Sequence, residues 1–125
     1  MPWGDEPLTG KLVIRRLFQE GHVYHGRDLL LITRHVEEGS RRVLFVASRR
    51  TGKAVRRNRA KRLMRAAYQD LVAQVRDVPV HLALIARSRC AERGMQDVRA
   101  ELRHLLGRAR LLATPTAPSE RRCRR

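Results

Sequence analysis

The segment spanning residues 49–69, RRTGKAVRRNRAKRLMRAAYQ, carries nine lysine and arginine side chains and no aspartate or glutamate. Guanidinium and ammonium groups bind phosphate oxygens, and neutralising the phosphates of a nucleic acid releases condensed counterions and thereby gains affinity. Acids are absent from Gly39 through Gln69, so no ion pairs along a helix would relieve the repulsion among these cations. The segment therefore predicts a binding site for an external polyanion.

The same segment has the spacing of a long helix with two different faces. Over residues 54–76, helical spacing predicts one buried apolar stripe, formed by Ala60, Met64, Ala67, Tyr68, Leu71, Val72 and Val75. Asn58, Lys61, Arg62 and Arg65 fall within an arc of roughly 100° directed away from that stripe. Asn58 offers donors and an acceptor, which suits a sugar or a base, and a local cap or turn is its alternative role. A solvated charged face is the ordinary alternative for the whole set, but such faces normally include acids.

Residues that could support catalysis or metal binding by the protein itself are scattered. The five histidines show neither a His-Glu-x-x-His pattern nor a ligand spacing with cysteines, and the acids lie mainly outside the basic segment. Lys53 follows Gly52 but precedes alanine, unlike the lysine of a nucleotide-binding phosphate loop. We therefore expect no catalytic side chains, no metal site and no protein nuclease centre.

The whole chain shares the excess of positive charge. Its 125 residues include 28 Lys and Arg against 12 Asp and Glu, which gives a net charge of +16 and a pI of about 11.7. These values favour a nucleic-acid partner over a membrane surface, because the basic segment is paired with an apolar face that a globular core needs. Cys90 and Cys123 have no close cysteine partner, and no signal peptide or membrane span is evident, so we expect a cytoplasmic protein.

The pattern along the chain predicts one α+β domain. We expect an irregular lead at 1–9, a single RNA-binding domain at 10–112 and a disordered basic tail at 113–125. Within the domain, the expected order is helix, strand, strand, helix, strand, helix, at 10–20, 29–35, 43–48, 54–76, 80–87 and 95–112. The first two strands, separated by a short Gly-Ser turn, are predicted to form a hairpin. Helices packed on the sheet give a two-layer α/β sandwich.

The stretch FVASRRTGKAVRRNRAKRLMRAAY, residues 45–68, resembles the signature of the bacterial ribonuclease P protein subunit. In that signature, a strand ends in serine and two cations and is followed by a loop that contains glycine. The helix after the loop carries the sequence Arg-Asn-Arg-x-Lys-Arg and a further Arg downstream. The matching residues here are Ser48, Arg49, Arg50, Gly52, Arg57, Asn58, Arg59, Lys61, Arg62 and Arg65, with Tyr68 at an aromatic core position. The order of elements and LALIAR in the third strand extend the resemblance over about 10–112.

The resemblance implies a subunit of a ribonucleoprotein that removes the 5′ leader from precursor tRNA, with catalysis and Mg²⁺ belonging to the RNA subunit. It implies that no protein oligomer is required, and that the catalytic RNA is contacted by Arg49, Arg50, Lys53, Arg57, Asn58, Arg59, Lys61, Arg62 and Arg65. A cleft for the single-stranded leader would be lined by Ile14, Phe18, Leu30 and Ile32. The implied fold is like the second domain of ribosomal protein S5, with a left-handed crossover between parallel strands through the long helix.

Two features of the sequence depart from the resemblance or allow another reading. Ile14 and Ile32 stand where the family often has aromatic residues, which predicts weaker base stacking on the leader or greater dependence on charge. For Phe18, burial in the core is the alternative to leader contact. A structural ribosomal or double-stranded RNA-binding protein is the alternative function. A helix-turn-helix regulator of DNA fits poorly, because a strand stands where its partner helix should be.

Overall fold

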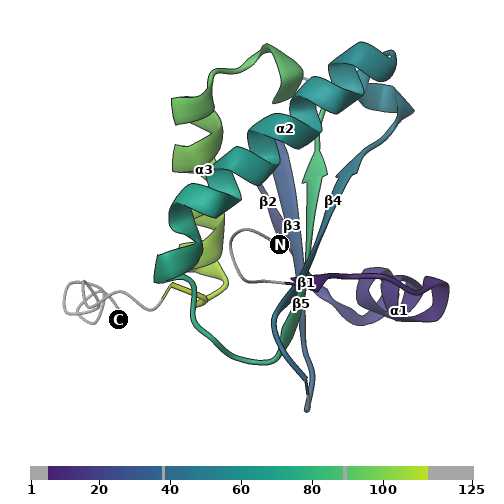
Figure 1. Cartoon of the computed structure of the whole chain (residues 1–125), viewed down its shortest axis with the longest axis vertical. Coiled ribbons are helices and arrows are strands. Elements are labelled where there is room, and N and C mark those ends of the chain that lie inside the picture. Colours follow the sequence, from purple (N-terminus) through teal and green to yellow (C-terminus); the bar gives the residue numbers. More distant parts are fainter. Residues whose placement is uncertain (1–5, 38, 89, 113–125) are drawn as a thin grey trace.

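The computed structural model describes residues 6–37, 39–88 and 90–112, in which three helices pack on one five-stranded sheet (Figure 1). The elements in chain order are β1 (Glu6–Pro7), α1 (Lys11–Glu20), β2 (His22–His25), β3 (Leu29–His35), β4 (Arg42–Ala47), α2 (Ala54–Leu71), β5 (Val80–Ala86) and α3 (Met95–Arg108). The predicted α+β class is confirmed. In the described part of the chain, no helix is both long and apolar enough to span a membrane. The expected tail at 113–125 lies outside the described residues.

The strand order is β1-β4-β5-β3-β2, so the predicted hairpin between β3 and β4 is wrong. Strand β5 lies between them, antiparallel to β3 and parallel to β4. The reason is burial: β5 is largely apolar on both faces, so it takes the centre of the sheet, where both of its edges are paired and most of its side chains are buried. The hairpin partner of β3 is instead β2, a strand of four residues that the sequence did not indicate.

Two predicted helix ends also shift. Helix α2 ends at Leu71 and continues as a single 3₁₀ turn, Val72–Gln74, so that Val75 leaves the helix and pairs with Leu112 in an isolated bridge. Helix α3 ends at Arg108, before the predicted end at residue 112. The chain reverses at Arg110, whose φ is 59°, and this turn directs Leu111 into the core. Burial of Leu111 thus outweighs continuation of the helix.

The alternation of side chains along the strands divides the apolar residues into two cores. Helices α2 and α3 cover one face of the sheet, and the larger core between them includes Leu31, Phe45, Met64 and Leu102. This arrangement confirms the predicted α/β sandwich, in which helices pack on the sheet. Helix α1 lies on the opposite face, where a smaller core is formed by Leu8, Leu17, Ile32 and Ala83. Strand β4, helix α2 and parallel strand β5 form the predicted crossover unit, whose left-handed sense stays a prediction.

Arginines fix the beginning of α2 to the rest of the protein. Arg56 donates from Nε to the carbonyl oxygen of Thr51 at 2.9 Å and forms an ion pair with Glu92 at 3.1 Å. Arg59 donates from Nε to the carbonyl oxygen of Ala91 at 2.7 Å. Both contacts connect α2 with the 3₁₀ turn at Cys90–Glu92, which precedes α3. These two side chains therefore contribute to the fold.

We predict that Arg59→Ala lowers the free energy of unfolding by about 1 kcal/mol, because it removes a hydrogen bond between a charged donor and a backbone carbonyl. The matched control is Arg62→Ala, three residues along the same helix, where no hydrogen bond or ion pair to a described residue is lost. We expect that control to stay within about 0.5 kcal/mol of the wild type in urea unfolding. Equal losses in the two variants would contradict the anchoring role of Arg59.

Candidate RNA-binding surface

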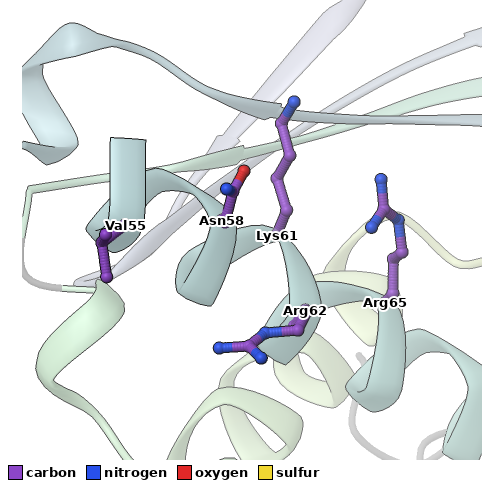
Figure 2. Close-up of a pocket in the computed structure, with 5 residues that line it drawn as sticks. All are labelled: Val55, Asn58, Lys61, Arg62 and Arg65. Carbon is purple, nitrogen blue, oxygen red and sulfur yellow. The ribbon is translucent and has the colours of Figure 1, made fainter. Parts of the chain in front are cut away.

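The outward face of α2 carries the three cations and the asparagine that the sequence predicted there. Asn58, Lys61, Arg62 and Arg65, which we call the α2 stripe, recur at intervals of three and four residues. Together with Val55 they line a shallow depression with a volume of about 530 Å³. Figure 2 shows the four polar side chains extending outward from α2. Lys61 and Arg65 extend in similar directions, and Arg62 extends in a different one. All four residues lie within α2, so the helical spacing that predicted a shared face applies to them.

The α2 stripe is not neutralised by acids of the described chain. Asn58, Lys61 and Arg62 make no side-chain hydrogen bond or ion pair with any residue that the structure describes. The Arg65 guanidinium lies 5.9 Å from the centroid of the Phe45 ring, a cation–π contact that orients the group without removing its charge. The stripe is therefore free to bind phosphate, sugar or base.

The start of α2 adds to the positive potential. Lys53 occupies the N-cap position without a side-chain hydrogen bond to the helix, and the first turn contains no acid. The first backbone N–H groups of a helix lack intrahelical acceptors and carry the positive end of its dipole. Cations are ordinarily unfavourable there, so their presence indicates an anion that comes from outside the protein.

The loop before α2 presents further cations. Gly52 has a φ of 130°, a conformation that strongly favours glycine, and a Cβ atom there would approach Arg56 within 2.7 Å. This sharp turn begins the helix directly after the 3₁₀ turn at Arg49–Thr51. The side chains of Arg50 and Lys53 are exposed around it. The loop and the stripe thus form one basic surface along the beginning of α2.

The nine residues predicted to bind RNA therefore separate into groups. Four form the α2 stripe, while Arg50 and Lys53 are on the loop, and Arg57 is half-buried without a side-chain partner among the described residues. Arg59 donates to the carbonyl oxygen of Ala91, a contact that the sequence could not reveal because it spans 32 residues, and its contact with RNA stays a prediction. The side chain of Arg49 lies outside what the structure describes.

On the opposite face of the sheet, α1 covers only part of the strands. Its Leu17 is fully buried against Ile32 and Ala83, and Glu20 pairs with Arg34 of β3 at 3.4 Å. A helix turns 100° per residue, so Ile14 and Phe18 lie on the other side of Leu17 from Glu20. They consequently lie toward the part of the sheet that α1 leaves open.

That open part is an apolar strip formed by Leu30, Ile85 and Val46, which are paired neighbours on β3, β5 and β4. All three are half-buried. Of the predicted cleft residues, Leu30 belongs to this strip, Ile14 is half-buried and Phe18 is 42 % exposed, whereas Ile32 is only 5 % exposed beneath α1. Sequence reasoning missed Ile85 and Val46, although the alternation of side chains along each strand could have assigned them to this face.

A second cross-strand row lies on the same face, beyond α1. Arg34, His81 and Arg42 are paired neighbours on β3, β5 and β4. Burial and then the charges of Arg34 and Arg42 lower the pKa of His81, so its imidazole is neutral at neutral pH. Burial likewise raises the pKa of the Cys90 thiol to about 11, which keeps it protonated. Both groups thus act as neutral side chains in the folded protein.

The chain can be compared with known proteins at the level of sequence. The family model described as Ribonuclease P matches residues 5–110. A ribonuclease P protein component from Shouchella clausii is 35 % identical over 98 residues, covering 78 % of this chain and 80 % of the relative. One from Chlorobaculum tepidum is 39 % identical over 119 residues, covering 81 % of this chain and 77 % of the relative.

Solved structures agree with this result. The RNase P protein from Thermotoga maritima superposes with a TM-score of 0.72 at 25 % identity and covers 82 % of this chain and 96 % of its own. The RNase P protein from Staphylococcus aureus, at 21 % identity, has the same fold with a TM-score of 0.75, covering 85 % of this chain and 96 % of its own. The basic stripe on α2 and the apolar strip beside α1 are therefore features of a chain that belongs to the ribonuclease P protein family.

Proposed function

We propose that this chain is the protein subunit of a ribonuclease P ribonucleoprotein that removes the 5′ leader from precursor tRNA. The RNA subunit holds the catalytic Mg²⁺ and performs the cleavage, and the protein binds that RNA and the leader. The observation that carries this proposal is the α2 stripe, whose charges no described acid neutralises. A polyanion supplies the missing counter-charge, and membership of the family supports the catalytic RNA as that polyanion.

The α2 stripe and the preceding loop would contact the RNA in two ways. The guanidinium groups of Arg62 and Arg65 can donate paired hydrogen bonds to phosphate oxygens, and Lys61 adds a point charge. Asn58 can donate to and accept from a ribose hydroxyl or a base edge. Contacts with phosphates position the protein and supply most of the affinity, whereas contacts with bases supply sequence specificity. Most of the affinity would therefore come from the cations, and it would fall as the salt concentration rises.

We predict that Arg62→Ala weakens binding to the catalytic RNA and reduces the slope of log K against log salt concentration by about 0.7–0.9. The loss follows from one fewer neutralised phosphate. The measurement is a filter-binding or anisotropy titration at several salt concentrations. Arg103→Ala removes the same charge from α3, and we expect it to leave both affinity and slope nearly unchanged. Equal changes in the two variants would mean that total charge, and not the α2 stripe, binds the RNA.

The apolar strip would receive the leader. Leu30, Ile85 and Val46 present hydrocarbon from the sheet, and Phe18, 42 % exposed, lies on the side of α1 that is directed toward them. Unpaired bases stack on aromatic rings and pack on apolar side chains, because every base has a π face. Mature tRNA lacks the leader, so this contact would favour substrate over product.

We predict that Phe18→Ala weakens binding of precursor tRNA to the assembled ribonucleoprotein by about tenfold, in the lower half of the 1–3 kcal/mol range for one stacked base. Mature tRNA should bind with unchanged affinity, because it has no leader to lose. Leu12→Ala, at a side chain 76 % exposed on the same helix, serves as the control. A similar loss for precursor and mature tRNA would place Phe18 in general packing and favour a non-selective RNA-binding function.

A further inference from the structure

We propose that the depression on α2 is a pocket for one unpaired nucleotide of the catalytic RNA, with Val55 contacting the apolar face of its base or ribose. This inference rests on the proposed function and adds a specific recognition residue to it. Val55 is the second residue of α2, and its side chain is 78 % exposed. Neither hydrophobic core includes it.

The position of Val55 distinguishes it from an isolated exposed apolar residue, which would need no explanation. It stands three residues before Asn58 and seven before Arg62, so it shares the face of the α2 stripe. The three side chains line the same depression, as Figure 2 shows. Valine also has a lower helix propensity than most residues, so the helix itself gains nothing from it. An apolar contact with the bound RNA would explain why Val55 stands among cations on this face.

The chemistry of the lining favours an unpaired nucleotide over a regular duplex. The outer surface of an A-form helix presents phosphates and hydroxyl groups, against which a valine side chain would make no favourable contact. An unpaired nucleotide presents the flat face of its base and the carbon edge of its ribose, and its phosphate can lie against Arg62. The Asn58 amide can then donate to and accept from the exposed edge of the base.

The groove between α2 and α3 provides an internal contrast. It has a volume of about 420 Å³ and is also lined by arginines. There, however, Arg99 pairs with Asp70 at 3.0 Å and Arg103 donates to Gln74 at 2.9 Å. Both arginines of this groove thus have partners within the protein, whereas Asn58, Lys61 and Arg62 of the α2 pocket have none among the described residues.

The test is Val55→Thr, which keeps the shape and the β-branched backbone preference of valine and replaces a methyl group by a hydroxyl. We expect binding of the catalytic RNA to weaken about three- to tenfold with an unchanged salt slope, because no phosphate contact is lost. Val55→Ile should retain the affinity, since it keeps the apolar contact. Val13→Thr, a surface valine in the first turn of α1, is the matched control and should bind as the wild type does.

A second measurement locates the nucleotide. Acylation of ribose 2′-hydroxyl groups modifies unpaired nucleotides preferentially. The wild-type protein should protect at least one unpaired nucleotide of the catalytic RNA from acylation. That nucleotide should become reactive again with Val55→Thr and stay protected with Val55→Ile. Wild-type affinity for Val55→Thr, or protection changes confined to paired segments, would overturn the pocket. The salt slope of Arg62→Ala tests the α2 stripe separately, so failure of the pocket and failure of the RNA-binding surface give different results.

Discussion

The structure depends on the apolar packing of the inner face of α2, which holds the cations of its outer face in place. Ala60, Met64, Ala67 and Tyr68 are fully buried on the inner face of α2, and the Tyr68 ring meets Phe45 edge to face with centroids 6.0 Å apart. Apolar burial contributes about 25 cal/mol per Å², so these side chains can offset the repulsion on the outer face. The helix therefore presents its cations rigidly before any RNA is bound, which reduces the ordering cost of association.

The arginines of this chain serve two purposes that composition alone cannot separate. Arg56 and Arg59 donate hydrogen bonds to backbone carbonyl oxygens of the chain, and together with the Arg56–Glu92 ion pair they hold α2 against the turn before α3. Arg62 and Arg65 face outward and keep their charge available. The fixed guanidinium fork suits both roles, since it binds a carbonyl oxygen or a phosphate with defined geometry.

Local patterns predicted the face of α2 well, because helical spacing alone determines which of its residues share a side. They failed for strand pairing, because the place of β5 between β3 and β4 depends on burial across the whole sheet. The anchoring contact of Arg59 could not be predicted for a similar reason, since its acceptor at Ala91 is distant in sequence. The strip formed by Leu30, Ile85 and Val46 likewise requires the register of three strands. The family resemblance supplied the functional context that none of these patterns contains.

The most direct test of the central claim is cleavage of precursor tRNA by reconstituted enzyme at low Mg²⁺, with two protein variants of equal net charge. One variant carries glutamine at Lys61, Arg62 and Arg65, and the other carries glutamine at Arg99, Arg103 and Arg110 of α3 and the turn that follows it. We expect the second variant to support cleavage and the first to do so only when the Mg²⁺ concentration is raised, and we expect no cleavage by either protein without RNA. Equal support by both variants, or cleavage by RNA-free protein, would contradict the central claim.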